Sequence, residues 1–156
     1  MFKINIHGIP FYGKYNKHHY KALFKIAKVT TKEQWNGIKG VYCNDGFSIP
    51  QGEELTGGLY IEFTGAPIVI LPYSDGTVEE IEIHQSPVIY IRGSCLKSEQ
   101  DFSFTLLHEL GHHNNRKKYG EWLPEKREEI EAHKFAAKLT AKIYGKVRVH
   151  QYIWLE

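Results

Sequence analysis

Hydrophobic and polar residues are arranged differently in successive parts of the chain, and each arrangement predicts a different element. Over residues 2–6 apolar residues alternate with polar ones, which is the period of a half-buried strand. Over residues 17–29 apolar residues recur at helical spacing while lysines occupy the other face, which predicts an amphipathic helix. The apolar positions of that helix are Tyr20, Leu23, Phe24 and Ala27. Thr31 and Gln34 then form a capping-box pattern, which predicts a short second helix.

The middle of the chain has the pattern of β-strands. Its apolar segments are short, rich in β-branched and aromatic residues, and separated by turn residues. These segments are LYIEF (59–63), PIVILPY (67–73), TVEEIEIH (77–84) and PVIYIRG (87–93). Residues 64–66 and 74–76 have the composition of hairpin connections. A small antiparallel sheet is therefore expected.

After residue 93 the spacing becomes helical again. Ser98 and Asp101 form an N-terminal cap pattern for a helix that should run to about Asn115. Pro124 suits the first turn of a following helix, and Gly145 is a natural stop for it. Beyond that helix, residues 147–149 and 152–154 have the composition of a strand or an extended tail.

These patterns predict an α+β fold in which a small antiparallel β-sheet packs against helices. We expect one domain over residues 1–156. It would consist of a basic strand and helix region at 1–40, the sheet at 41–93, and two helices at 98–145.

Composition narrows the class of protein. Hydrophobic residues make up 42% and charged residues 24% of the 156 residues, which is ordinary for a soluble globular protein. No apolar stretch approaches the roughly 20 residues that a membrane helix needs, so no membrane partner is expected. The N-terminal segment does not have the pattern of a signal peptide, and we expect a cytoplasmic protein. Neither Cys43 nor Cys95 lies in a CxxC pair, so a thiolate zinc site is not predicted.

The net charge of +2 conceals a segregation of charge along the chain. Residues 1–40 carry eight lysines and one acid, whereas residues 41–91 carry eight acids and no lysine or arginine. A basic segment with several tyrosines and histidines is compatible with contact to nucleic acid or to an acidic partner. No nucleic-acid-binding signature accompanies the charge, so nucleic acid is not the expected partner. We favour a fold in which the two segments pack beside one another.

The segment FTLLHELGHH contains the pattern His-Glu-x-x-His at His108, Glu109 and His112. Residues four apart on a helix project from one face about 6 Å apart along the axis, so two neutral imidazoles can bind one Zn²⁺. Glu109 lies at the edge of that face, where its carboxylate can act as a general base. Gly111 costs a helix about 1 kcal/mol relative to alanine, which indicates close approach of a neighbouring backbone or a substrate-side strand. His113 points about 100° from His112 and is expected at the helix end or on the surface.

A catalytic zinc site needs a third protein ligand and an open position for water. Metzincins place Gly and His at positions that are Asn115 and Lys118 in this chain, so that class is excluded. A glutamate of the second helix remains, as in gluzincins, and the candidates are Glu121, Glu125, Glu128, Glu129 and Glu131.

Helical geometry ranks these glutamates. Glu129 shares a stripe with Ala132, His133 and Ala136, and the small residues of that stripe would let the two helices approach. Glu128 lies about 100° from the stripe and ranks second.

Two motifs together resemble a known family. The segments PVIYIRGS, FSFTLLHELGHH and EEIEAHKFAAKL, between residues 87 and 140, are similar to the ImmA/IrrE-type metallopeptidases of bacteria and their phages. The family pattern is a strand, a capped helix with HELGH, and E-x-x-A-N-x-F-A-A on the next helix. The resemblance implies a minimal zincin-like domain with one catalytic Zn²⁺, bound by His108, His112 and Glu129, and with Glu109 catalytic.

The chain departs from that pattern at two places. His133 stands where the family has Asn, and KLTAKIYGKV replaces the usual Leu-Leu-Met-Pro ending. His133 would either support a ligand histidine by hydrogen bonding or add a fourth nitrogen and close the site. A side chain that stabilises the oxyanion is also expected, and the candidates are Tyr119, Tyr144 and His133.

The sequence therefore predicts a zinc-dependent metallopeptidase that hydrolyses a protein or peptide, bound along an edge strand of the sheet. The family resemblance implies a regulatory substrate such as a DNA-binding repressor. The alternative is a catalytically silent, zinc-stabilised binding module, such as an anti-repressor or a phage accessory protein. Glu109 favours the enzyme, whereas His133 and the atypical C-terminal segment favour the module.

Overall fold

The fold begins with a β-hairpin closed by two residues in the left-handed region. β1 (Ile4–Ile6) and β2 (Ile9–Gly13) are antiparallel, and His7 and Gly8 between them have φ of 50° and 86°. Two successive positive φ values give a tight turn whose twist matches that of the strands. This computed structural model describes residues 4–13, 15–43, 58–62, 68–72, 78–82, 86–92 and 98–145.

Two capped helices follow the hairpin. α1 (Lys17–Val29) has the predicted bounds, and α2 (Lys32–Trp35) starts with the predicted capping box of Thr31 and Gln34. The predicted buried face of α1 is partly wrong. Ala22, Leu23 and Ile26 face the core together with His19, whereas Tyr20 and Phe24 are 39% and 65% exposed.

The main sheet is mixed. It has the strand order β1-β2-β3-β7-β4, with β3 at Gly40–Cys43, β4 at Gly58–Ile61 and β7 at Val88–Ile91. β3 lies parallel to both β2 and β7, while β4 is antiparallel to β7 and forms an edge of the sheet. The α+β class is confirmed, but the all-antiparallel sheet is wrong because α1 carries the chain back to start β3 in the same direction as β2.

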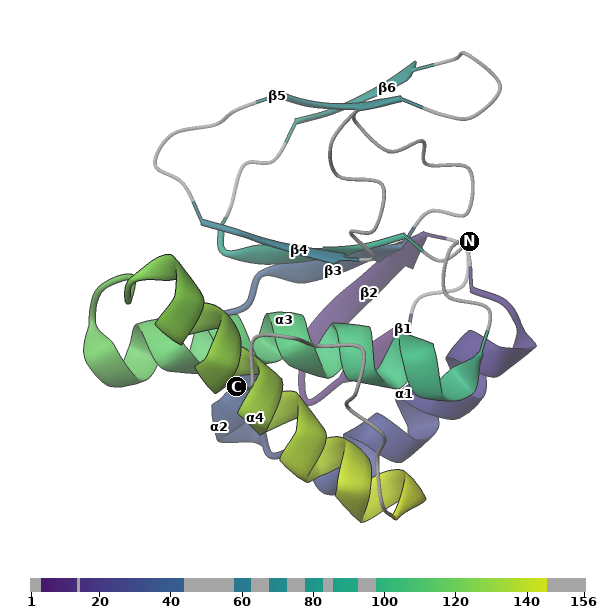
Figure 1. The fold of residues 1–156 in the computed structure, drawn as a ribbon. Helices are drawn as coiled ribbons and strands as arrows, with labels where there is room; N and C mark the ends of the chain where they lie inside the picture. Colours follow the sequence, from purple (N-terminus) through teal and green to yellow (C-terminus); the bar gives the residue numbers. More distant parts are fainter. Residues whose placement is uncertain are drawn as a thin grey trace.

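A second sheet consists of β5 (Ile68–Pro72) and β6 (Val78–Glu82), which are antiparallel. In Figure 1 this pair lies on the opposite side of the main sheet from the helices. The strands expected between residues 59 and 93 are all present. The proposed hairpin connections at 64–66 and 74–76, and the segments at 147–149 and 152–154, lie outside the described residues.

Two long helices complete the fold. α3 (Glu99–Tyr119) begins after the predicted Ser98 cap and ends at Gly120, whose φ of 72° is left-handed. It is therefore one turn longer than expected, since Gly120 and not Asn115 sets its end. α4 (Glu125–Tyr144) starts directly after Pro124 and stops at Gly145 as predicted.

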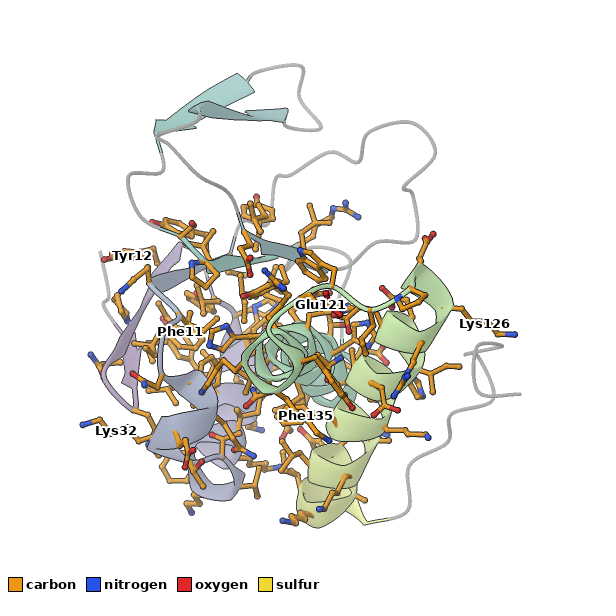
Figure 2. All side chains as sticks on the ribbon, turned by 90° about the vertical axis from the view of Figure 1, so that its left-hand side faces the viewer. Phe11, Tyr12, Lys32, Glu121, Lys126 and Phe135 are labelled. Carbon is orange, nitrogen blue, oxygen red and sulfur yellow. The ribbon has the colours of Figure 1, made fainter. Side chains whose placement is uncertain are left out.

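The core lies between the main sheet and the helices. α3 runs beneath the sheet with α1 and α4 beside it (Figure 1), and Figure 2 looks roughly along α3 with Phe11 pointing inward and Lys32 and Lys126 pointing outward. The buried side chains include Phe11, Val41, Ile89, Ile91, Leu23, Ile26, Trp35, Phe102, Leu106, Leu107, Leu110 and Leu139. Among the described helices, none has the length and hydropathy that a membrane crossing requires.

Candidate metal centre

α3 presents two imidazoles on one face. Its start is fixed by Ser98, whose side-chain oxygen accepts a hydrogen bond of 3.0 Å from the backbone amide of Asp101. Its rotation is fixed by the three leucines within residues 106–110, which are fully buried in the core. The face that remains carries His108 and His112, whose ring centroids are 4.8 Å apart.

Glu129 of α4 meets both imidazoles. Its Oε2 lies 2.9 Å from Nε2 of His108, and its Oε1 lies 3.3 Å from Nε2 of His112. One donor atom from each of the three residues lies within 4.8 Å of the other two. Two imidazole nitrogens and one carboxylate oxygen form a donor set of the kind that catalytic zinc takes. The group can therefore hold a metal ion, and its geometry favours Glu129 over the other glutamates of α4.

The close approach predicted at Gly111 is present. A Cβ built at Gly111 would lie 2.9 Å from the carbonyl oxygen of Ala132 and 3.0 Å from its Cα. Ala132 and Ala136 are fully buried against α3. These small residues allow the two helices to meet, which places Glu129 next to the imidazoles.

Glu109 is held under the edge strand. It is 7% exposed, and the backbone amide of Tyr60 in β4 donates a hydrogen bond to it. A Cβ at Gly58 would lie 3.1 Å from Cγ of Glu109, so β4 passes directly over this side chain. Burial raises the pKa of Glu109, although the neighbouring His108 and His112 act in the opposite direction. A carboxylate with a raised pKa is suited to accept a proton near neutral pH.

The ligand candidates influence one another. Hydrogen bonds from His108 and His112 hold the pKa of Glu129 well below its usual range. Burial lowers the pKa of His112, but the hydrogen bond with Glu129 and the charges of nearby glutamates outweigh burial and raise it overall. These hydrogen bonds keep the Glu129 carboxylate ionised, and the ionised form is the one that binds a cation.

Of the further candidates, His133 lies nearest to the centre. It is 1% exposed, and its ring centroid is 4.8 Å from that of Phe104 and 6.3 Å from that of His108. Burial and the charge of His108 lower the pKa of His133 to about 4, so its imidazole is neutral at physiological pH. His133 does not belong to the group of donor atoms within 4.8 Å of one another.

The two tyrosine candidates lie elsewhere. The hydroxyl of Tyr144 is 2.8 Å from Oγ of Ser103 and 3.1 Å from Oε1 of Glu99. Along α4, Tyr144 is about 22 Å from Glu129. Tyr119 lies in the last turn of α3, about 10 Å along the axis from His112. The hydroxyl of Tyr144 is therefore held away from this centre, and the role of Tyr119 stays a prediction.

His113 has a structural role that the sequence did not predict. It is 4% exposed, so the expected surface position is wrong. Its Nε2 lies 2.7 Å from the backbone oxygen of Asn36, and its Nδ1 lies 2.9 Å from the hydroxyl of Tyr60. Nε2 therefore donates to the carbonyl, and Nδ1 accepts from the tyrosine. Burial lowers the pKa of His113, which favours this neutral form. The side of α3 next to the face with His108 and His112 is therefore covered by β4 and by the turn after α2.

A second contact joins the residue that follows β4 to α3. Arg116 donates hydrogen bonds to both carboxylate oxygens of Glu62, with a shortest distance of 2.5 Å. The guanidinium also lies 5.0 Å from the ring centroid of Trp122, which is 48% exposed. The Trp122 ring is 6.4 Å from that of His112, so an exposed aromatic residue borders the metal centre. Nothing in the local sequence of these residues indicated that they would meet.

Comparison with known proteins agrees with this geometry. The sequence model of the IrrE N-terminal-like domain, a peptidase family designated M78, matches residues 62–140, just over half of the chain. That range contains α3 and the part of α4 with the metal-ligand candidates. No curated protein and no solved structure gives a significant match. Membership of such a family implies a function of the metallopeptidase type. The chain belongs to the M78 family of IrrE N-terminal-like peptidases.

Proposed function

We propose that this protein is a zinc-dependent metallopeptidase that cleaves a peptide bond in a protein substrate. One observation carries the proposal: Nε2 of His108, Nε2 of His112 and the Glu129 carboxylate converge, and Glu109 lies buried beside them. A structural zinc site needs no such additional carboxylate. Glu109 therefore supports the enzyme over the catalytically silent binding module.

The donor set fits zinc. Imidazole and carboxylate suit Zn²⁺, and three protein ligands leave the fourth position for water or substrate, as catalytic zinc sites do. When bound, zinc would polarise the scissile carbonyl and lower the pKa of water at the site toward about 7. His108, His112 and Glu129 would hold the ion.

Glu109 would move the proton. Its carboxylate takes a proton from the attacking water as the new C–O bond forms, and it delivers that proton to the amine nitrogen as the C–N bond breaks. The hydrogen bond from the Tyr60 amide orients Glu109 for both steps. Because β4 is an edge strand beside Glu109, an extended substrate segment would pair with its outer side.

The substrate would be a regulatory protein, such as a DNA-binding repressor, cut at one site. This assignment comes from the family resemblance of the motifs and from the edge strand, which suits an extended protein segment more than a small molecule.

The test has two parts. Zinc content after dialysis is measured for wild type and for His108→Ala, Glu129→Ala and Glu125→Ala, the last being an exposed glutamate of the same helix. We expect about one zinc per chain in wild type and Glu125→Ala, and little in the other two. Equal zinc in all four proteins would reject the assigned ligands.

The second part separates the enzyme from the binding module. Wild type and Glu109→Gln are incubated with candidate regulatory proteins, and the products are identified by mass spectrometry. The enzyme predicts cleavage by wild type and none by Glu109→Gln, which should retain its zinc. Regulation of a partner that persists in Glu109→Gln would favour the binding module.

A further inference from the structure

Glu128, the residue before Glu129, also lies at the candidate metal centre. Its carboxylate points toward Asn115 and does not belong to the group of three ligand candidates. Glu128 is 4% exposed, although a carboxylate at this depth is normally destabilising unless it is paired. Asn115 of α3 donates a hydrogen bond of 2.5 Å from its Nδ2 to Oε2 of Glu128. The same amide nitrogen is 3.5 Å from the backbone oxygen of Glu128.

Glu128 faces the second nitrogen of a ligand candidate. Nδ1 of His112 lies 3.9 Å from Oε2 of Glu128, while Nε2 of the same ring lies 3.3 Å from Glu129. Consecutive glutamates of α4 therefore approach the two nitrogens of one imidazole. A closure of about 1 Å would bring Nδ1 into hydrogen-bond distance.

Both partners of this contact have unused hydrogen-bonding capacity. Within the described part of the chain, Nδ1 of His112 and Oε1 of Glu128 are buried and have no hydrogen-bond partner. A buried polar atom without a partner is destabilising, and such atoms are uncommon in native proteins. A hydrogen bond between Nδ1–H and the Glu128 carboxylate would satisfy the imidazole nitrogen.

We infer that Glu128 is a positioning residue that accepts a hydrogen bond from Nδ1 of His112 and so directs the lone pair of Nε2 toward the metal. The inference rests on the proposed zinc site. Asn115 is one turn beyond His112 on α3 and holds the Glu128 carboxylate in place, so His112, Glu128 and Asn115 form a chain of contacts between the two helices. A carboxylate partner fixes the tautomer of a ligand histidine and strengthens its bond to the metal.

A purely structural role makes a different prediction. A buried carboxylate that only filled space would be replaced by its amide without effect on metal binding, since the two groups have nearly the same shape. A positioning carboxylate contributes to zinc affinity through its negative charge and its acceptor oxygen. Loss of either one should therefore weaken zinc binding. Zinc affinity therefore distinguishes the two roles, and the stability of the metal-free chain serves as the control.

The experiment measures zinc dissociation constants by competition with a chromophoric chelator, using the full chain. Glu128→Ala should weaken zinc binding by about 10- to 100-fold. Glu128→Gln should weaken it less, because an amide oxygen can still accept from Nδ1–H. Glu125→Gln, at an exposed position one turn earlier on α4, should bind zinc as wild type does. Thermal melting of the metal-free proteins shows whether each variant is folded.

A spectroscopic measurement reports the hydrogen bond itself. In the zinc-loaded chain, the Nδ1–H proton of His112 should give a downfield imidazole resonance that exchanges slowly with water. The same resonance should move upfield and exchange faster in Glu128→Ala, and Glu125→Gln should leave it unchanged. If Glu128→Ala does not fold, the affinity and the resonance of Glu128→Gln are compared with those of wild type.

The outcomes are separable. Suppose that wild type binds zinc, and that the Glu128 variants match Glu125→Gln both in zinc affinity and in the His112 resonance. This result would overturn the positioning role alone. Failure of wild type to bind zinc would overturn the proposed function and, with it, this inference.

Discussion

Gly111 of α3 and Ala132 of α4 meet main chain to main chain, with only 2.9 Å between the Ala132 carbonyl oxygen and the place where a Cβ of residue 111 would be. Backbone atoms cannot move aside as the end of a flexible side chain can. The helices can therefore pack at this distance only because residue 111 lacks a side chain. The distance matters for the proposed site, because His108 and Glu129 extend from the same pair of helices and would have to reach a common ion.

Gly111→Ala should destabilise the protein. Alanine improves helix propensity by about 1 kcal/mol, but overpacking at a tight contact typically costs about 1–3 kcal/mol. We expect a lower free energy of unfolding in urea and weaker zinc binding, since α4 must move away. Ala132→Gly should not rescue the variant, because the two atoms nearest to a new Cβ belong to the main chain of residue 132. Wild-type stability together with wild-type zinc affinity would contradict the argument.

Zinc should stabilise the folded chain, and chelation should remove that effect. The candidate ligands come from two helices, so the ion would join α3 to α4 in the folded state only. At a free zinc concentration 100-fold above the dissociation constant, the gain is about 2.7 kcal/mol. Calorimetry with zinc and with a chelator measures the difference in melting temperature. His108→Ala should melt at the same temperature under both conditions.

Tyr60→Phe should destabilise the contact between β4 and α3. The change removes the hydroxyl that Nδ1 of His113 accepts from and leaves that buried nitrogen without its partner. The expected loss is about 1–3 kcal/mol in urea unfolding. Peptidase activity should change little, because the substitution retains the backbone amide of Tyr60 that donates to Glu109. Tyr119→Phe, at the end of α3, serves as the control and should change neither quantity.

The ion pair of Glu62 and Arg116 should make a small part of the stability depend on pH. Hydrogen bonds from Arg116 lower the pKa of Glu62 from its ordinary value of 4.5. The folded chain therefore binds this proton less readily than the unfolded chain does. The stabilisation is present above about pH 4.5 and is lost as the pH falls through the lowered pKa.

The Glu62→Gln variant tests this dependence. At neutral pH the variant should be less stable than wild type by no more than about 1 kcal/mol, because the pair is partly exposed. The difference should vanish in strong acid. Urea unfolding at several pH values measures it, and a difference that persisted at the lowest pH would show that the side chain contributes through packing.

Truncation of two apolar residues of α1 should destabilise the protein by very different amounts. Ile26 is fully buried, so Ile26→Ala should cost about 2–5 kcal/mol. Phe24 is 65% exposed, and Lys28 lies 4.2 Å from its ring centroid, so Phe24→Ala should cost less than about 1 kcal/mol. Urea unfolding of the pair checks the corrected orientation of the helix, and the reverse order of effects would reject it.

The helix termini were predictable because short-range interactions determine them. Thr31, Ser98 and Gly145 act through hydrogen bonds or backbone angles within a few residues, so the sequence pattern contains nearly everything that decides them. The approach of the three ligand candidates was predictable from helical spacing. His108 and His112 are four residues apart on one helix, and small residues around Glu129 indicated a close helix pair.

Features that depend on distant residues were missed. The parallel pairing of β3 with β2 and β7 joins segments far apart in the chain, and strand composition does not encode its direction. The expected apolar face of α1 differs from the buried face because it did not include His19, which packs into the core. Its ring stacks on Phe102 at 4.4 Å, and its Nδ1 accepts a hydrogen bond from the backbone amide of Asn16.

The Ser98 cap fixes more than the first turn of α3. Every residue added to or removed from the segment between the cap and His108 would turn the imidazole pair by about 100° around the helix axis. A single such change would point the imidazoles away from α4 or move three buried leucines out of the core. The number of residues between cap and motif is therefore under the same constraint as the motif itself, so insertions or deletions in this interval should not be tolerated.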